Sequence, residues 1–338
     1  MSGITGWAAK EPKTGLQLLK YDTKVLGDDE VEVSVEYCGL CHSDVSIANN
    51  DWGLTQFPVI PGHEAIGQVS AIGKNVKNLK IGDYVGVGWH VGSCMHCELC
   101  LSGEQNLCSD IQPTIIGNHG GFAEKVRTHW MWAIPIPRQL DVASAGPLLC
   151  AGATVFAPLL TYGIKPTDRV GIVGIGGLGH LALQFANAWG CEVTAFTSNK
   201  EKSDEAHEFG AHHVVDSTSS ADILSRADSL DFLLVTVNSK LDWSAYVKTL
   251  KKNGKMAFVG LVLDPMEASV VDLVVGQKLI AGSANAGPAV ISKMLEFAAR
   301  HSIAPIVEHF PMSKVNEAID HLLTGKARYR VVLDADFN

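Results

Sequence analysis

The sequence lacks the features of a membrane protein and of a nucleic-acid-binding protein. Nowhere in its 338 residues do about 18 apolar residues follow one another, so no membrane-spanning helix is expected. The N-terminal residues contain no basic segment followed by an apolar stretch, which argues against a signal peptide. Basic residues are not in excess: the net charge is −9, which favours neither nucleic acid nor an anionic membrane as a partner. These absences predict a cytoplasmic protein.

Internal repeats and low-complexity segments are also absent, which argues against a repeat array. The composition, with 46% hydrophobic residues, 19% charged residues and 33 glycines, is typical of an α/β protein with many tight turns. A chain of this length is expected to form two domains and to bury a substantial core.

The pattern of apolar residues changes near residue 150. Before it, short β-runs such as VEVSVEYC are separated by glycine and proline, which predicts a small barrel-like or irregular β domain. After it, strand-like and helical runs alternate: RVGIVGIG is followed by LGHLALQFANAWG and then by CEVTAFT. This alternation predicts a doubly wound parallel sheet. Beyond residue 287 a longer helical run, AVISKMLEFAARH, is followed by strand, helix and strand.

The sequence contains eight cysteines. Because disulfides are rare in a reducing cytosol, clustered cysteines are expected to be metal ligands or catalytic groups. Four of them have the spacing C-x2-C-x2-C-x7-C: Cys94, Cys97, Cys100 and Cys108. Thiolates this close in sequence can converge on one tetrahedral zinc ion, at Zn–S distances of about 2.3 Å. An iron–sulfur cluster is the rival interpretation. Because no proline follows the fourth cysteine and the loop is polar, structural zinc is favoured, and its four protein ligands leave no position for a substrate.

A second candidate metal site lies in residues 38–64, which are crowded with cysteine, histidine, aspartate and glutamate. A catalytic zinc needs three protein ligands and an open position. Cys41 and His63 are candidate ligands, and Cys150 is the best third ligand left in the sequence. Glu64 would lie behind the metal or exchange with its water. On spacing alone, a polar loop without a metal stays open as the alternative. The two remaining cysteines lie in strand-like runs and are expected in the core: Cys38 and Cys191.

The third motif is a glycine-rich turn, GIGGLG, at residues 174–179. A G-x-G-x-x-G pattern alone is weak evidence. Here it follows an apolar strand and opens an amphipathic helix, which is the context that a dinucleotide-binding fingerprint requires. Glycines let the backbone approach a pyrophosphate at the helix N-terminus. The predicted cofactor contacts are Gly174, Gly176, Gly177, Leu178 and Gly179.

The end of the next predicted strand indicates which dinucleotide is bound. An NAD site usually places a carboxylate there, which holds the ribose 2′-hydroxyl. This sequence reads AFTSNKEK, with neutral residues followed by lysines: Thr197, Ser198, Asn199, Lys200 and Lys202. Glu201 lies past the strand end and is expected to be solvated. Hydroxyl and ammonium groups suit a 2′-phosphate, so NADP(H) is the predicted cofactor.

Five motifs in this order resemble the zinc-dependent medium-chain alcohol dehydrogenases: CGLCHSD, PGHEAIGQV, CMHCELC, LLCAGATVF and GIGGLGH. The similarity is greatest to the cinnamyl alcohol dehydrogenase branch. GGFAEKVR, AGPLLCAGATVF and KARYRVVL narrow it to bacterial-type NADPH-dependent aldehyde reductases of broad specificity. The resemblance covers essentially the whole chain. It implies a GroES-like, zinc-binding catalytic domain at residues 1–149 and 287–338 and an NADP-binding Rossmann domain at 150–286. It also implies a homodimer through the cofactor domain, for which LIAGSANAG, residues 279–287, is a reasonable place for pairing.

The resemblance also implies roles for individual residues. Cys41, His63 and Cys150 would bind the catalytic zinc, with Glu64 as an alternating or outer ligand; the Cys₂His set is known from alcohol dehydrogenase itself. By the same resemblance, Asp44 would orient the His63 ring and Ser43 would transfer a proton to the substrate oxygen. His42 and Arg330 would contact the cofactor pyrophosphate. The substrate pocket, by the same resemblance, is lined by Trp52, Leu54, Trp89, Ile116 and Asn285.

One position departs from the family pattern. Many relatives have a histidine two positions after the aspartate, at the end of a proton relay, and this chain has Ser46 there. The relay would then end through ordered water or through another group such as His90 or His119, and the sequence does not choose among them.

The predicted function is therefore the reversible reduction of aromatic and aliphatic aldehydes to primary alcohols by hydride transfer from NADPH. Zinc would act as the Lewis acid and Ser43 as the proton donor. The predicted complement is two zinc ions per chain and NADP(H). Two alternatives remain: a zinc-independent quinone or enoyl reductase of the same superfamily, which lacks the Cys41, His63 and Cys150 set, and a non-catalytic NADP-binding zinc protein.

Overall fold

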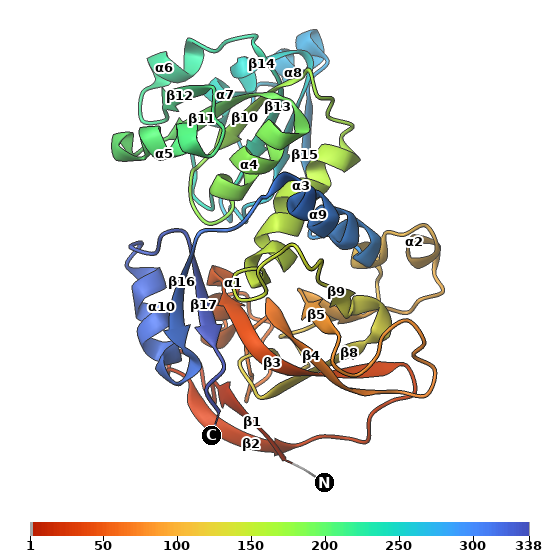
Figure 1. Ribbon diagram of the computed structural model, residues 1–338. Helices are drawn as coiled ribbons and strands as arrows, with labels where there is room; N and C mark the ends of the chain where they lie inside the picture. Colours follow the sequence, from red (N-terminus) through yellow and green to blue (C-terminus); the bar gives the residue numbers. More distant parts are fainter. Residues whose placement is uncertain (1–2, 338) are drawn as a thin grey trace. The chain divides into compact units, whose positions relative to one another are not determined.

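The computed structural model describes residues 3–337 and consists of two compact units (Figure 1). Unit 1 comprises the residues up to 153 and those from 285 onward, and unit 2 comprises residues 154–284. The domain boundaries predicted from the sequence are 149/150 and 286/287. Unit 1 is rich in antiparallel strands and unit 2 has a parallel sheet with helices, so the predicted α/β class is confirmed. Among the described residues, no helix is long and apolar enough to cross a membrane.

Unit 1 is built on a seven-stranded sheet, in the order β16-β17-β3-β4-β5-β9, with β8 paired to β3. The pair β16·β17 is parallel and the other pairs are antiparallel. The strands are β3 (Glu30–Leu40), β4 (Ala65–Ile72), β5 (Tyr84–Val87), β8 (Lys125–His129), β9 (Ile134–Pro135), β16 (Val307–Pro311) and β17 (Arg330–Asp334). Two-stranded sheets are formed by β1 (Gly3–Ala8) with β2 (Gln17–Asp22) and by β6 (His90–Gly92) with β7 (Gln112–Pro113).

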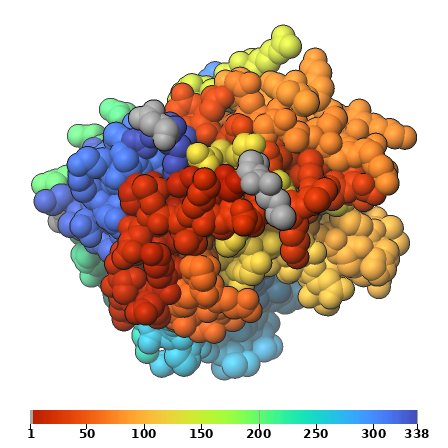
Figure 2. All heavy atoms as spheres, turned by 90° about the horizontal axis from the view of Figure 1, so that it is seen from below, coloured from red at the N-terminus to blue at the C-terminus, as the bar shows by residue number. Residues whose placement is uncertain are grey.

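Helices and 3₁₀ turns lie between the strands of unit 1. They are α1 (His42–Asn49), α2 (Glu98–Leu101), α9 (Pro288–His301) and α10 (Val315–Leu323), with 3₁₀ turns η1 (Gln105–Leu107), η2 (Trp130–Trp132), η3 (Gly146–Leu149) and η5 (Met312–Lys314). On the face seen in Figure 2, residues of the N-terminal strands (red) form much of the surface of this unit.

The long strand β3 organises the core of unit 1. Branched residues at every second position, Val31, Val33 and Val35, are buried, as the period of two along a strand requires. β3 pairs with β4, β8 and β17, so it lies in the interior of the sheet. It ends at Leu40, and α1 begins two residues later, which fixes Cys41 at the rim of the sheet.

Unit 2 contains a six-stranded parallel sheet in the order β12-β11-β10-β13-β14-β15. Its strands are β10 (Arg169–Val173), β11 (Glu192–Thr197), β12 (His213–Asp216), β13 (Leu230–Val235), β14 (Leu250–Phe258) and β15 (Leu279–Gly282). Its helices are α3 (Ala151–Thr161), which begins at the boundary, α4 (Gly179–Trp189), α5 (Ser203–Glu208), α6 (Ser220–Leu224), α7 (Trp243–Thr249) and α8 (Val270–Gly276), with the turn η4 (Lys200–Lys202). The inner strands β10, β11 and β13 are nearly continuous buried apolar runs, as expected where helices cover both faces of a sheet.

Candidate active site and metal centres

Asp44 connects the two segments that carry the candidate catalytic metal ligands. It lies in the first turn of α1, and its Oδ2 accepts a hydrogen bond from the backbone N–H of Cys41, 2.9 Å away, which is one half of a capping box. Its Oδ1 accepts the N–H of Gly62 at 2.7 Å and contacts Nδ1 of His63 at 2.8 Å. The carboxylate is 1% exposed. The buried carboxylate of Asp44 is thus stabilised by three hydrogen-bond donors.

Four potential metal ligands converge beside Asp44. One ligand atom from each lies within 4.8 Å of those of the others: Cys41, His63, Glu64 and Cys150. His63 Nε2 lies 3.3 Å from the Cys150 Sγ, and the His63 and Glu64 side chains are fully buried. Two thiols, an imidazole and a carboxylate are the donor types that zinc takes. The residues present therefore fit a zinc ion, and the structure brings all four predicted ligands together.

The electrostatics of this cluster act differently on its members: the pKa of Cys41 is lowered, whereas the hydrogen bond to Cys41 and burial raise the pKa of Cys150. A hydrogen bond from Cys150 holds the pKa of the Cys41 thiol well below its usual range, although burial opposes this, and Arg330 and His63 act in the same direction as the bond. Burial lowers the pKa of His63, but the Asp44 carboxylate outweighs burial and leaves the pKa well above its usual value. A metal requires the neutral ring, with Nδ1–H facing Asp44 and the Nε2 lone pair toward the thiols, so a bound ion would displace the second proton that the raised pKa retains.

Glu64 and Arg330 form a buried ion pair behind the cluster. An Nη2 of Arg330, on β17, contacts Glu64 Oε1, and the side chains are 5% and 0% exposed. Burial raises the pKa of Glu64, and Arg330 opposes that rise. Glu64 Oε2 and Arg330 Nε have no hydrogen-bond partner among the described residues. A Cβ at Gly39 would collide with Glu64 Oε2, so only glycine fits there.

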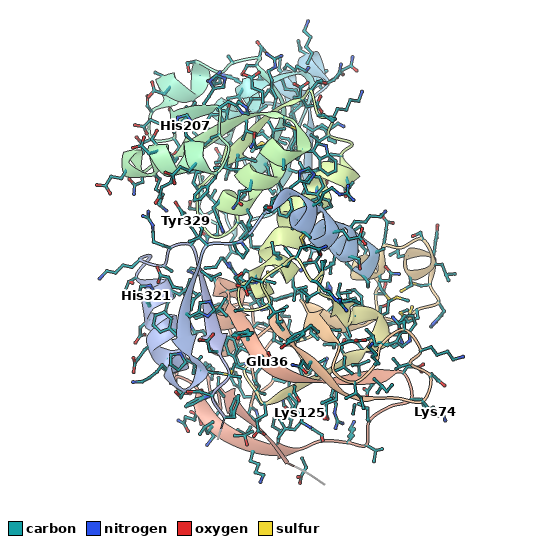
Figure 3. All side chains as sticks on the ribbon, in the orientation of Figure 1. Glu36, Lys74, Lys125, His207, His321 and Tyr329 are labelled. Carbon is teal, nitrogen blue, oxygen red and sulfur yellow. The ribbon has the colours of Figure 1, made fainter. Side chains whose placement is uncertain are left out.

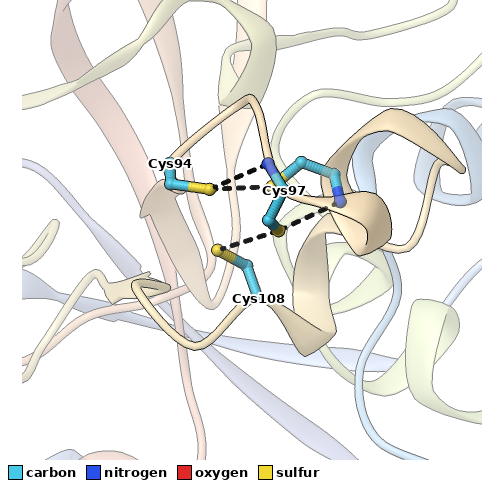
Figure 4. Close-up of side chains that lie close together, drawn as sticks. Cys94, Cys97 and Cys108 are labelled. Carbon is cyan, nitrogen blue, oxygen red and sulfur yellow. Dashed lines mark hydrogen bonds between the residues drawn. The ribbon is translucent and has the colours of Figure 1, made fainter.

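The second cysteine cluster lies on the loop that carries α2 and η1 (Figure 4). Sulfur–sulfur distances of 3.8 Å join Cys94 to Cys100 and Cys97 to Cys108. Backbone N–H groups point at three of the sulfurs, at 3.4 to 3.5 Å. Such bonds, from the backbone of His96 and Cys97, lower the pKa of Cys94 to about 6. All eight cysteines are free, so this cluster is a set of thiols suited to a tetrahedral metal ion.

The predicted proton donor, Ser43, lies next to the first cluster, with its Oγ 3.8 Å from the Cys41 Sγ. His42 is exposed and Ser46 is half-buried. The rings of the two histidines considered for the end of the relay lie against other residues: His90 contacts Trp132 at 5.2 Å, and His119 contacts Tyr21 at 4.3 Å. Burial lowers the pKa of His90 to about 4. The end of the relay therefore stays open.

The predicted pocket residues fall into two groups. The edge-to-face contact between Trp89 and the His63 ring has a centroid distance of 4.7 Å, and Trp52 lies 6.2 Å from Trp89. These two tryptophans and Ile116 are half-buried against the core of unit 1. Two residues lie outside this group. Leu54 is 55% exposed, and the Asn285 C=O accepts a hydrogen bond from Asn106 Nδ2 at 2.6 Å.

In unit 2, the glycine-rich turn connects β10 to the first residue of α4. Gly174 has φ +90°, a left-handed conformation that favours glycine, and a Cβ on Gly179 would collide with the Gly174 carbonyl. The predicted 2′-phosphate segment begins at the end of β11, where Thr197 Oγ1 accepts the Asn199 N–H at 3.2 Å. Lys202 Nζ donates to the carbonyl of Ile175 at 3.1 Å. The glycine turn and the predicted phosphate segment are thus adjacent.

Sequence reasoning missed two supporting residues, Gly39 and Thr236, and the ion-pair partner of Arg330. Gly39 makes room for Glu64, and the guanidinium of Arg330 pairs with Glu64 rather than standing free, so its contact with a pyrophosphate stays a prediction. Thr236 Oγ1, at the end of β13, donates to the carbonyls of Val173 and Gly174, at 2.9 Å each, and so fixes the glycine turn. Gly39 lies within the motif CGLCHSD, which was the one usable signal for it, whereas Thr236 lies in none of the motifs.

The chain is similar to known alcohol dehydrogenases along its length. Residues 27–138 match the alcohol dehydrogenase GroES-like domain, and residues 177–300 match the zinc-binding dehydrogenase family. Aldehyde reductase AdhA of Synechocystis sp. is 49% identical over 335 residues, which cover 99% of this chain and 100% of that protein. Probable cinnamyl alcohol dehydrogenase 6 of Arabidopsis thaliana is 38% identical, covering 97% of this chain and 93% of its own.

Solved structures of cinnamyl alcohol dehydrogenases have the same fold. SbCAD4 of Sorghum bicolor superposes with a TM-score of 0.94 at 35% identity, and 98% of each chain is covered. The enzyme of Helicobacter pylori, complexed with NADP(H), superposes with a TM-score of 0.89 at 30% identity, again with 98% of each chain covered.

Proposed function

The chain belongs to the zinc-dependent alcohol dehydrogenase family, and from that premise we propose that it reduces aldehydes to primary alcohols with NADPH at the cluster of Cys41, His63 and Cys150. The enzyme class, alcohol dehydrogenase or aldehyde reductase, follows from the membership. The cofactor, the mechanism and the substrate range are the proposal. The observation that carries it is the convergence of two thiols, an imidazole and a carboxylate in one buried cluster.

A zinc ion held by Cys41, His63 and Cys150 would, when bound, supply Lewis acidity toward the aldehyde oxygen, while the nicotinamide supplies the hydride. The protein's part is to hold the ligands in the correct protonation state. Asp44 keeps the proton of His63 on Nδ1, through the 2.8 Å contact. Glu64 is kept beside the cluster by Arg330, with its Oε1 4.0 Å from His63 Nε2, where it can act as an alternating ligand.

Ser43 supplies the proton in this proposal. Its hydroxyl lies beside the Cys41 sulfur, on the first turn of α1, and is half-buried. From this position the hydroxyl donates a hydrogen bond to the substrate oxygen and transfers its proton as that oxygen becomes an alcohol. Because Ser46 replaces the histidine of many relatives, the proton returns to Ser43 by a route that does not depend on a histidine at that position.

The cofactor proposal rests on unit 2. Residues 174–179 would hold the pyrophosphate at the N-terminus of α4, where backbone N–H groups are unpaired by the helix. Thr197, Ser198, Asn199 and Lys202 would receive the 2′-phosphate, because no carboxylate stands at the end of β11 to repel it. NADP(H) in the Helicobacter pylori relative supports this choice. His42 and Arg330 are the proposed additional contacts to the pyrophosphate.

The substrate pocket is proposed to be apolar and aromatic. Trp52 and Trp89 provide its described aromatic part, and Leu54, Ile116 and Asn285 complete the proposed lining. Such a pocket discriminates weakly between aldehydes that differ by one methylene, by about 1–3 kcal/mol. Both aromatic and aliphatic aldehydes are therefore proposed substrates.

We also propose a homodimer in the cytoplasm. β15 is an edge strand of the parallel sheet, and such an edge offers unpaired backbone groups to a second copy. The adjacent helix α8 exposes four valines by 69–73%: Val270, Val271, Val274 and Val275. Exposed apolar residues beside an open edge indicate an interface.

Eight free cysteines fit a reducing compartment. Sedimentation of the chain, and of a variant with Val271→Lys and Val275→Lys, tests the interface: a monomer only in the variant supports it, and an unchanged mass contradicts it.

The decisive experiment follows cofactor oxidation with cinnamaldehyde, using NADPH and NADH in parallel. A fast rate with NADPH, a slower rate with NADH and loss of both after metal chelation support the proposal. A chelator-resistant rate would favour the zinc-independent reductase, and no turnover in protein shown to hold zinc would contradict the aldehyde assignment.

A matched pair of variants locates the reaction in the protein. Cys41→Ala removes a proposed zinc ligand, and Cys191→Ala removes a buried cysteine of unit 2 outside both cysteine clusters. We expect Cys41→Ala to lose turnover while its circular dichroism stays native, and Cys191→Ala to keep it. Full activity of Cys41→Ala would refute the site.

A further inference from the structure

A cavity of about 470 Å³ lies in unit 1, outside both cysteine clusters. Its lining comes mainly from β2, from β8, from the loop at residues 117–119 and from residues 91–93, which directly precede the four-cysteine loop, and no cysteine of either cluster contributes to it. The volume is within the range of small-molecule sites, about 300–1,000 Å³. We propose that this cavity binds a small, neutral molecule with several hydroxyl groups, such as a sugar or a polyol.

The two cations that β8 contributes to the cavity are paired with Glu32. Lys125 (labelled in Figure 3) and Arg127 project from β8, and both contact Glu32. Lys125 Nζ lies 2.6 Å from Glu32 Oε1, and Arg127 contacts Oε2 from Nε at 2.9 Å and from Nη2 at 2.7 Å. Arg127 also donates to Thr23 Oγ1 and to the Lys24 carbonyl. Because its guanidinium is held on several sides, it is not poised to bind a free anion.

What remains in the lining is a mixture of donors and acceptors. Asp22 and Glu30 present carboxylates, while Lys125 keeps N–H donors beyond its one bond to Glu32. Gln112 can both donate and accept. The phenol of Tyr21 stays protonated because burial raises its pKa. With Lys24 added and Glu32 paired to the β8 cations, the positive and negative charges around the cavity balance, so neither sign predominates. Hydroxyl groups both donate and accept without carrying charge, and they match such a lining.

An aromatic pair adds to this chemistry. The rings of Tyr21 and His119 lie 4.3 Å apart with planes inclined by 55°, and both line the cavity. The Nδ1 atom of His119 is buried and has no hydrogen-bond partner among the described residues. Because this nitrogen is fully buried, it does not reach a molecule in the cavity, and the pair contributes ring surface rather than a hydrogen bond. Burial lowers the pKa of His119, which keeps the imidazole neutral, as a neutral ligand requires.

The loop that lines the cavity continues into the segment that precedes His63. Gly120 and Gly121 donate their N–H groups to the carbonyls of Ile60 and Gly62, at 2.8 and 2.7 Å. The N–H of Gly62 in turn donates to Asp44. The cavity is therefore separate from the metal cluster but shares a backbone connection with it, so a bound ligand is expected not to compete with the aldehyde.

The test uses methyl β-xylopyranoside, which is neutral and has no primary hydroxyl group, and benzoate as an anionic probe. Binding is followed by saturation-transfer NMR on the full chain. Tyr21→Ala removes one cavity ring, and Tyr37→Ala is its matched control, because Tyr37 forms a ring pair with His309 outside the cavity at 6.4 Å. Gln112→Trp fills the cavity from an exposed position and serves if Tyr21→Ala does not fold.

We expect the xyloside to bind in the millimolar range, and binding to weaken roughly tenfold in Tyr21→Ala and in Gln112→Trp but not in Tyr37→Ala. Cinnamaldehyde should leave the xyloside signal unchanged. Absence of binding to the native chain, a preference for benzoate, displacement by cinnamaldehyde, or equal loss in Tyr37→Ala would each overturn the proposal.

Discussion

Replacing Asp44 by asparagine tests how the protein prepares His63. The carboxylate accepts three hydrogen bonds, from Cys41 N–H at 2.9 Å, from Gly62 N–H at 2.7 Å and from His63 at 2.8 Å. An asparagine keeps the shape, but its NH₂ group must face at least one donor. Leaving one buried donor without an acceptor costs about 1–3 kcal/mol, and we expect the free energy of unfolding to fall by that amount.

The effect on zinc should be larger than the effect on folding. If the amide turns its NH₂ group toward His63, the ring proton moves to Nε2, which is the nitrogen aimed at the cluster. Loss of such an outer partner typically costs about 10–100-fold in metal affinity. Competition with a chromophoric chelator measures this affinity, and chemical denaturation measures the folding cost.

The control for this substitution is Asp242→Asn in unit 2. Asp242 caps α7 by accepting the Ala245 N–H at 3.2 Å, and asparagine caps helices about as well as aspartate. It should change neither zinc affinity nor stability appreciably. If Asp44→Asn retained the zinc affinity of the native chain, the proposed role of the carboxylate in setting the His63 tautomer would be wrong.

Three further predictions concern other parts of the chain. Gly39→Ala should push Glu64 out of place and cost about 1–3 kcal/mol in denaturation, and native stability would show that the strand can shift. Lys202→Ala, which removes the contact to Ile175, should raise KM for NADPH roughly tenfold and leave KM for NADH unchanged; equal changes would contradict a phosphate contact. The two cations on β8 hold the pKa of Glu32 below 4.5 against the effect of burial, so its contribution to stability is present above pH 4.5 and disappears as the pH falls below it. Glu32→Gln should therefore flatten the acid limb of the stability curve, and an unchanged limb would assign that limb to other carboxylates.

The sequence predicted those parts of the structure whose signals are local. The four-cysteine loop, the glycine turn and the alternation of strands and helices each occupy a short stretch, so their spacing alone carries the information. The α/β class and the family were confirmed for this reason. Short helices of unit 2 with weak periodicity, α6 and α8 among them, were not predicted, because five to seven residues offer too little pattern to separate a helix from a loop.

Contacts between distant residues could not be predicted from spacing. His63 and Cys150 are 87 positions apart, and Glu64 and Arg330 are 266 positions apart. The register of β3 against β4 and β17 brings Glu64 and Arg330 together, and the turn η3, which packs against β3, β5 and β17, places Cys150 beside His63. The sequence placed Cys150 as a leftover candidate, and only the resemblance to a family gave it a role. The pairing of Arg330 with Glu64 had no signal at all.

The four-cysteine loop is also bonded to a distant segment of unit 1, because Asn106 Nδ2 donates a hydrogen bond to the carbonyl of Asn285. Residue 285 is where the chain re-enters unit 1 after its excursion through residues 154–284, and α9 begins three residues later. A Cβ at Gly287 would crowd the Gly103 carbonyl, so the loop and the re-entry point fit closely. The loop thus connects the two separate segments of chain that form unit 1. If the four cysteines hold the predicted zinc ion, its removal would weaken the contact between these two segments, far along the sequence from any cysteine.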